Sequence, residues 1–176
     1  TIQLVVAGND TQGLRYGTIE TTETYYLAWK EPSDIKNPLD KSILQLFDKK
    51  RFLEIIHDFI LFDAGVKKVP RHNQYFGVKA AQERLKKSEG GIIWHTQGSG
   101  KSITMVLLSR WVRENITDSR VLVITDRKEL DEQIEGDFLG AGEEIYRCAS
   151  AKDLIDNLNT SQPPLLCSLV HKFGHQ

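Results

Sequence analysis

The sequence contains little cysteine and methionine and no long hydrophobic run. Its two cysteines, Cys148 and Cys167, stand in no CxxC or metal-ligand spacing, which favours two inert thiols in a reducing compartment over a disulfide. No stretch reaches the roughly 18 uncharged apolar residues that a membrane span needs. The N-terminus lacks the charged-then-apolar pattern of a signal peptide. These absences predict a soluble, cytoplasmic protein with no membrane contact.

An excess of charge of either sign is also missing. The chain has 23 basic and 24 acidic residues among 176, a formal net charge of −1. This balance excludes a disordered acidic or basic tail and the cationic surface of small DNA-coating proteins, so any nucleic-acid contact must be local. The single methionine is the internal Met105, so Thr1 is not a natural start, and we expect an internal fragment of a longer protein.

The first thirty residues are rich in strand-forming types. Residues 2–6 form an apolar run, residues 8–10 have turn chemistry, and residues 17–26 are rich in β-branched and aromatic side chains. We therefore expect a β-rich segment over residues 1–30.

A linker and a helical connector are predicted over residues 31–65. Two prolines interrupt residues 31–38, and Asn37-Pro38 fits a helix N-cap followed by proline at the first helical position. Apolar residues then recur at spacings of three and four between positions 44 and 60, and Gly65 is the expected stop.

From about residue 73 onward, helical patterns alternate with short apolar runs. The predicted helices cover residues 73–88, 101–115, 127–138 and a segment opened by Ser150, and the predicted strands cover residues 92–94, 121–124, 144–148 and 165–170. Strand–helix repetition with short connections predicts an α/β fold with a parallel sheet and helices on both faces.

The octet at residues 95–102, His-Thr-Gln-Gly-Ser-Gly-Lys-Ser, lies between a predicted strand and a predicted helix, as a phosphate-binding loop (P-loop) does. Gly98 and Gly100 allow backbone N–H groups to turn toward anionic oxygens. Lys101 supplies a mobile charge for the β- and γ-phosphates of a nucleotide, and Ser102 offers a hydroxyl to Mg²⁺. The octet thus predicts a site for ATP and Mg²⁺.

The strict P-loop pattern fails at its first position, where His95 replaces glycine. An ordinary glycine-bearing turn between strand and helix is the alternative. A dinucleotide-binding fingerprint is rejected, because it needs a third glycine where Ile103 stands and would not place Lys101 in the first helical turn.

Three segments around the loop, residues 74–81, 91–102 and 121–134, resemble the R (motor and restriction) subunit of type I restriction enzymes. In that family a histidine commonly fills the first loop position, as His95 does. Related superfamily 2 helicases and translocases share the loop but usually lack the sequence Thr-Asp-Arg-Lys-Glu-Leu-Asp that begins at Thr125.

The resemblance implies a P-loop NTPase (RecA-like) fold and a division into three parts. Residues 1–30 would be the tail of an upstream nuclease domain, residues 31–65 the linker and helical connector, and residues 66–176 part of the first RecA-like ATPase domain. It implies that the intact subunit is an ATP-dependent type I site-specific deoxyribonuclease that pumps double-stranded DNA, in complex with modification (M) and specificity (S) subunits. The nuclease residues and the acidic ATPase motif would lie outside this chain, so the fragment itself would be inactive.

Two functions from other classes stay open at this point. One is a P-loop kinase or transferase acting on a small molecule, which would consume ATP regardless of DNA. The other is a non-catalytic scaffold that binds nucleotide weakly.

The resemblance also implies individual roles. Lys101 would be the catalytic residue and Ser102 the Mg²⁺ ligand. The nucleotide-binding set would be Gln74, Thr96, Gln97, Gly98, Ser99, Gly100, Lys101 and Ser102. Gln74 takes the place of a glutamine that reads adenine, because its amide matches the donor–acceptor pair of the base edge. The alternative is that Gln74 is a helix-surface or capping residue.

DNA contacts are implied at two strand ends. Thr125 and Arg127 come directly after the strand at 121–124. Ser168 and Lys172 belong to a later segment that resembles a DNA-contacting segment of the family, although Leu169 stands where a threonine is often found. Asp126, with Glu129 three residues on, is expected to cap the next helix; a magnesium site at that strand end is the least favoured interpretation.

Overall fold

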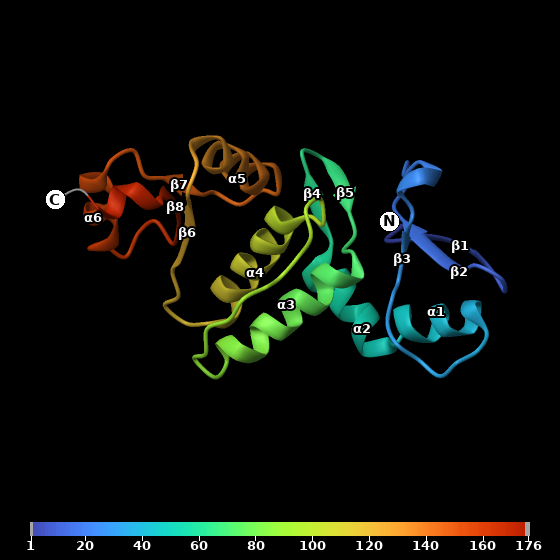
Figure 1. Cartoon of the computed structure of the whole chain (residues 1–176). Coiled ribbons are helices and arrows are strands. Elements are labelled where there is room, and N and C mark those ends of the chain that lie inside the picture. The colour runs from blue at the N-terminus through green and yellow to red at the C-terminus, as the bar shows by residue number, and fades with distance from the viewer. Residues whose placement is uncertain (1, 175–176) are drawn as a thin grey trace. The chain divides into compact units, whose positions relative to one another are not determined.

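The computed structural model describes residues 2–174 of a mixed α/β chain (Figure 1). Its contacts divide it into two units, Thr1–Gly100 and Lys101–Gln176. The first unit takes in the predicted β-rich segment, the connector and the helix before the loop. The expected boundaries at residues 30 and 65 stay predictions.

The first unit begins with an antiparallel sheet in the order β1-β2-β3. Its strands are β1 (Val5–Asn9), β2 (Gly13–Gly17) and β3 (Leu27–Ala28). The β-rich start is confirmed, but the turn lies after Asn9, whose side chain accepts from the amides of Thr11 and Gln12. Residues 17–26 are largely loop with a short 3-10 helix, η1 (Glu23–Tyr25), and not the expected strand. The Thr21 hydroxyl accepts from the Thr18 amide, a local bond that competes with strand pairing.

The connector starts as predicted. Asn37 caps α1 (Pro38–Leu46) by accepting from the amides of Leu39 and Asp40, and Pro38 occupies the first turn. A second helix, α2 (Lys49–Glu54), is capped by Asp48 and continues into the π-helical turn η2 (Ile55–Phe59).

The expected helix end at Gly65 is wrong, because the chain forms a hairpin there. The hairpin joins β4 (Leu61–Asp63) to β5 (Val66–Lys68). Both turn residues have positive φ, 48° at Ala64 and 83° at Gly65, which matches the twist of a tight hairpin. The helical spacing of apolar residues therefore ends before Leu61.

Aromatic side chains form the core that joins the sheet to α3 (His72–Leu85), the helix expected over residues 73–88. The buried Tyr16 hydroxyl donates to the carbonyl of Pro70 over 2.8 Å. The ring of Trp29 lies 5.4 Å from that of Tyr75, with the Arg51 guanidinium 5.2 Å above Trp29.

The second unit contains a parallel sheet in the order β6-β8-β7, as predicted for an α/β fold (Figure 1). In chain order its elements are α4 (Lys101–Asn115), β6 (Val121–Thr125), α5 (Lys128–Gly140), β7 (Tyr146–Arg147), α6 (Ala151–Leu158), β8 (Leu165–Leu169) and the 3-10 helix η3 (Val170–Phe173). The central strand β8 is buried along its whole length. Ser150 caps α6 by accepting from the Asp153 amide, as its position before the helix predicts.

The strand expected over residues 92–94 is wrong for the part of the chain described. This segment is irregular there, and Ile92 and Trp94 are each 90% exposed. A three-residue apolar segment gains strand structure only by pairing, and the sheets of this chain are formed by other residues. The apolar composition of residues 92–94 therefore does not show whether the segment pairs with another strand.

Two further properties concern the whole described range. Among residues 2–174, no helix combines the length and the apolarity that crossing a bilayer requires. Both cysteines are free and buried. Burial raises the pKa of the Cys167 thiol to about 12, which keeps it protonated and unreactive at neutral pH.

Candidate functional site

The glycines of the loop at residues 95–100 have left-handed backbone conformations. The φ angle is 75° at Gly98 and 80° at Gly100. Between them the Ser99 hydroxyl donates to the Thr96 carbonyl over 2.7 Å. A Cβ at position 98 would meet open space, so glycine is favoured there by φ alone. A Cβ at position 100 would lie 2.4 Å from Nε2 of Gln74, so any other residue there would displace the Gln74 amide.

Three consecutive carbonyls of the loop face the start of α3. The bonds run from Arg71 Nη1 to Gly98 O (3.0 Å), from Asn73 Nδ2 to Ser99 O (3.5 Å) and from Gln74 Nε2 to Gly100 O (3.0 Å). In a trans peptide the N–H points opposite to the C=O of the same plane. Holding the carbonyls against α3 therefore turns the loop amides away from that helix, which is the arrangement an anion needs.

Gln74 joins the loop to the helix with both ends of its amide. Its side chain is buried, Nε2 donates to Gly100, and Oε1 accepts from the Arg71 amide over 2.8 Å. The capping interpretation of Gln74 is thus confirmed. The adenine contact stays a prediction.

His95, which breaks the strict loop pattern, is half-buried beside α3. A Cβ added at Gly77 would lie 3.2 Å from the imidazole ring, so the helix offers a glycine where the ring approaches. Gly77 of α3 therefore leaves room for the His95 ring.

A cavity of about 520 Å³ opens beside the loop within the first unit. It is lined by residues 94–99 of the loop, residues 71–73 at the start of α3, and residues 26–28, with Arg15 and Lys30. Among these described lining residues the charged side chains are all cationic, and no carboxylate is present. The volume lies in the range of small-molecule and cofactor sites.

The charge of the cavity comes from its arginines and its lysine. Burial, and then the charge of Lys30, lower the pKa of His72 below its ordinary value of 6.5, so this imidazole is neutral at pH 7. Arg15, Lys30 and Arg71 therefore supply the positive potential, which favours a polyanionic ligand.

Lys101 and Ser102 follow Gly100 directly in the chain and open α4, the first helix of the second unit. Lys101 is exposed and Ser102 is half-buried. The helix start agrees with the prediction, and the N-terminal end of a helix favours a bound phosphate through its dipole. In the described residues no three His, Cys, Asp or Glu side chains gather as a metal site. The Ser102 hydroxyl is the Mg²⁺ ligand that the sequence predicts within this chain.

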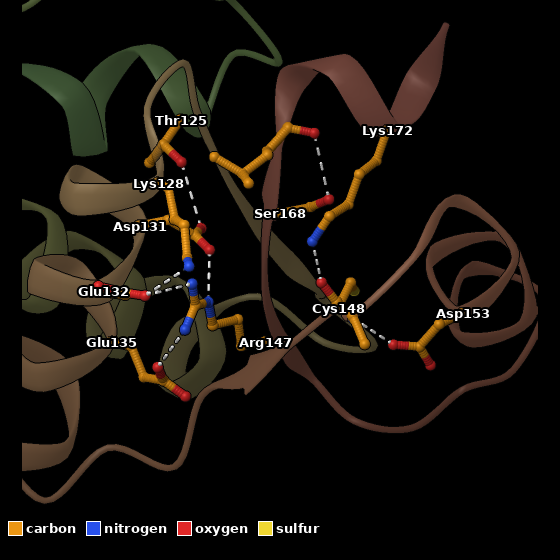
Figure 2. A network of polar contacts seen from close by, with 12 residues as sticks. Thr125, Lys128, Asp131, Glu132, Glu135, Arg147, Cys148, Asp153, Ser168 and Lys172 are labelled. Atoms are coloured by element: carbon orange, nitrogen blue, oxygen red, sulfur yellow. Dashed lines mark hydrogen bonds and ion pairs between the residues drawn. The ribbon is translucent and has the colours of Figure 1, made fainter. Parts of the chain in front are cut away.

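The residues predicted to contact DNA lie in the second unit, and three of them make internal contacts (Figure 2). Thr125 is buried, and its hydroxyl donates to Oδ1 of Asp131 over 3.2 Å. Ser168 is fully buried in β8, and Lys172 donates to the carbonyl of Cys148. A DNA contact through these three side chains stays a prediction.

Arg127 is placed differently from the other three. Its side chain is 78% exposed and lies 3.5 Å from Asp126. The expectation that Asp126 caps the following helix is wrong, because the N-cap of α5 is Arg127 and has no side-chain capping bond. The helix starts one residue later than the Asp-x-x-Glu spacing requires.

Sequence reasoning missed the buried network around Asp131 (Figure 2). Asp131 is 0% exposed, and its carboxylate accepts from Arg147 Nε over 2.6 Å. Arg147 also pairs with Glu132 and Glu135, at 3.3 and 3.4 Å. These carboxylates belong to α5 and the arginine to β7, so no local pattern could reveal the pairing. Local sequence patterns likewise could not show that Arg15 and Lys30 line the cavity.

The chain is similar to known ATPases and to restriction-enzyme subunits. Residues 73–176 match the SWI2/SNF2 ATPase family. The chain is 31% identical over 150 residues to the putative type I restriction enzyme MjaIXP endonuclease subunit of Methanocaldococcus jannaschii, covering 78% of this chain and 14% of that protein. It is 32% identical over 124 residues to the type I restriction enzyme HindI endonuclease subunit of Haemophilus influenzae, covering 62% of this chain and 11% of that protein. The chain thus spans only a small part of the relatives that it matches.

Proposed function

The chain belongs to the family of type I restriction enzyme endonuclease subunits, and from this premise we propose that residues 95–102 bind ATP with Mg²⁺ in a DNA-translocating motor. One observation supports this most: the loop borders a cationic cavity that has no carboxylate among its described lining residues. A triphosphate needs compensating positive charge, and Arg15, Lys30 and Arg71 supply it at the cavity.

Each loop residue has a proposed task on a RecA-like fold. Backbone amides of residues 96–100, that is Thr96, Gln97, Gly98, Ser99 and Gly100, surround the phosphates. Lys101 brings its ammonium to the β- and γ-phosphates, and the Ser102 hydroxyl holds Mg²⁺. When bound, the ion neutralises charge on the phosphate oxygens. Gln74 keeps the loop in shape and, in this proposal, also reads the adenine edge.

Double-stranded DNA is the proposed substrate of the motor. Arg127 is exposed at the start of α5, where a guanidinium and the helix amides could bind a backbone phosphate. Thr125, Ser168 and Lys172 are kept as weaker candidates because of their internal contacts. The M and S subunits are the proposed partners, and the cytoplasm is the proposed location, in accord with two buried free thiols.

The test is ATP turnover by the intact subunit, with and without duplex DNA. Lys101→Ala should lower DNA-stimulated turnover on the order of 100-fold or more while circular dichroism stays unchanged. The control is Lys36→Ala, an exposed lysine outside the cavity, which should behave as wild type. Full turnover by Lys101→Ala would refute the loop assignment.

The DNA dependence separates the motor from the other P-loop enzymes. The motor should be stimulated by duplex DNA, with an affinity that falls steeply as salt rises. Turnover that ignores DNA would favour a small-molecule kinase or transferase instead. Calorimetry with Mg-ATP that shows no binding would favour the scaffold.

A further inference from the structure

We infer that Thr125 and Asp131 are positioning residues for Arg127. They fix the turn between β6 and α5 from which the Arg127 guanidinium projects, and Thr125 acts through this turn and not by touching DNA. The inference rests on the proposed function, because it takes Arg127 to bind a phosphate of duplex DNA.

A side-chain bond closes the turn between β6 and α5 (Figure 2). Thr125 is the last residue of β6, and Asp131 lies in the first turn of α5. The Thr125 hydroxyl donates to Oδ1 of Asp131 over 3.2 Å, and the Asp131 amide donates to the Arg127 carbonyl over 3.0 Å. Asp131 thus holds the strand end with its side chain and Arg127 with its backbone.

This bond stands where a helix cap would otherwise fix the start of α5. A guanidinium has no acceptor for the orphan amides of a helix, so Arg127, the N-cap residue, makes no capping bond with its side chain. In the same unit α6 is capped in the ordinary way, by the Ser150 hydroxyl. The place where α5 begins therefore depends on the bond between Thr125 and Asp131.

Asp131 is itself held from a second strand. Its side chain is 0% exposed, and Oδ2 accepts from Arg147 Nε over 2.6 Å. Arg147 lies in β7, which pairs with the central strand β8, and Thr125 ends β6, which pairs with β8 on the other side. A buried carboxylate with both oxygens bonded has a fixed orientation. The turn is therefore attached to the sheet through two strands.

The base of the turn is buried and its tip is exposed. Thr125 is 4% exposed, whereas the side chain of Arg127 is 78% exposed. The buried hydroxyl is already bonded to Asp131, so a phosphate would meet the guanidinium and not the threonine. A binding loop that is fixed in advance loses less conformational freedom when its ligand binds. Thr125 should therefore raise the affinity for DNA through Arg127.

The test is the dissociation constant of the intact subunit for a fluorescently labelled DNA duplex, measured by anisotropy. Thr125→Val keeps the shape of the side chain and removes the hydroxyl, whereas Thr125→Ser removes a methyl group and keeps the hydroxyl. Thr125→Val should weaken binding about threefold to tenfold, the range for ordering one loop side chain, and Thr125→Ser less than about twofold. The reverse order would show that Thr125 only fills space and would overturn the inference.

Two further variants complete this comparison. Asp131→Asn leaves one acceptor oxygen for the two donors and should weaken DNA binding by a factor similar to that of Thr125→Val. Thr117→Val changes an exposed threonine in the turn before β6 and is the matched control, which should bind as wild type. Circular dichroism and the thermal midpoint of each variant show whether it is folded.

A double-mutant cycle with Arg127→Ala shows whether the hydroxyl acts through the guanidinium. Arg127→Ala alone should weaken DNA binding about tenfold, the equivalent of one charge-assisted hydrogen bond, and lower the salt slope by about one. In that background Thr125→Val should weaken binding less than about twofold further, because coupled residues are not additive. A full additional loss would make Thr125 a direct DNA contact and overturn the inference.

The same cycle separates this inference from the proposed function. If Arg127→Ala weakens DNA binding and Thr125→Val does not, the inference fails and the DNA contact of Arg127 stands. If Arg127→Ala binds DNA as wild type, the DNA contact of Arg127 fails and the inference fails with it.

Discussion

Nε2 of Gln74 lies 3.0 Å from the carbonyl oxygen of Gly100, and a Cβ at position 100 would approach the same nitrogen to 2.4 Å. The buried glutamine thus fixes the last residue of the loop through close contact. The shape of the phosphate loop depends on a side chain from α3, outside the motif itself.

Alanine substitutions at the two left-handed glycines should differ in cost. Gly98→Ala should lower the free energy of unfolding by about 1 kcal/mol, the cost of the left-handed backbone alone. Gly100→Ala should lower it by about 3 kcal/mol, because the new methyl group also overlaps Gln74. Urea denaturation measures both values. Equal losses would contradict the close contact.

Gln74 can be assigned to structure or to adenine recognition by one comparison. Gln74→Ala removes the partner of the Arg71 amide and of the Gly100 carbonyl, and should cost about 1–3 kcal/mol of stability. If Gln74 also reads adenine, the variant should lose preference for ATP over GTP, measured as a ratio of dissociation constants. An unchanged ratio with weaker binding of both nucleotides would leave it a purely positioning residue.

Local chemistry made much of the fold predictable. Two helix caps, at Asn37-Pro38 and at Ser150, depend on contacts within a few residues. The parallel strands at residues 121–125 and 165–169 could be predicted because short apolar runs alternate with helical patterns. The prediction of a strand at residues 92–94 was wrong because apolar composition does not specify a pairing partner. The prediction of a helix end at Gly65 was wrong because a glycine can end a helix or form a hairpin turn equally well.

The loop itself could be predicted, but its surroundings could not. Spacing identified residues 95–102, since the residue types there are set by phosphate chemistry. The cavity wall at Arg15 and Lys30 depends on how a distant sheet packs on α3. Likewise, nothing in the sequence around Thr125 indicated that its hydroxyl is bonded to a buried Asp131.

Removing Arg147 should destabilise the protein more than removing the charge of its half-exposed partner Glu132. Arg147→Ala leaves Asp131 buried without its cation and should cost about 3 kcal/mol. Glu132→Gln is the control, because Glu132 is half exposed and its pairing should contribute less than about 0.5 kcal/mol. Thermal unfolding compares the two. A similar, small loss in both variants would show that the buried pair does not carry the stability assigned to it.

The pKa of His72 measures how strongly the Lys30 charge acts within the cavity. It is lowered from 6.5 by burial and then by the Lys30 charge, because a nearby cation disfavours the imidazolium form. Lys30→Ala should therefore raise the pKa, while burial keeps it below 6.5. An NMR titration of the imidazole signals measures the shift. A pKa that does not move would mean that Lys30 does not face His72 across the cavity.

The position of the bound triphosphate decides whether residues 95–102 are the phosphate site, and a crystal structure of the intact subunit with a non-hydrolysable Mg-ATP analogue would give it. We expect β- and γ-phosphate oxygens within about 3 Å of the amides of Gly98 and Gly100 and of Nζ of Lys101. A nucleotide bound elsewhere, with this loop closed onto itself, would contradict it.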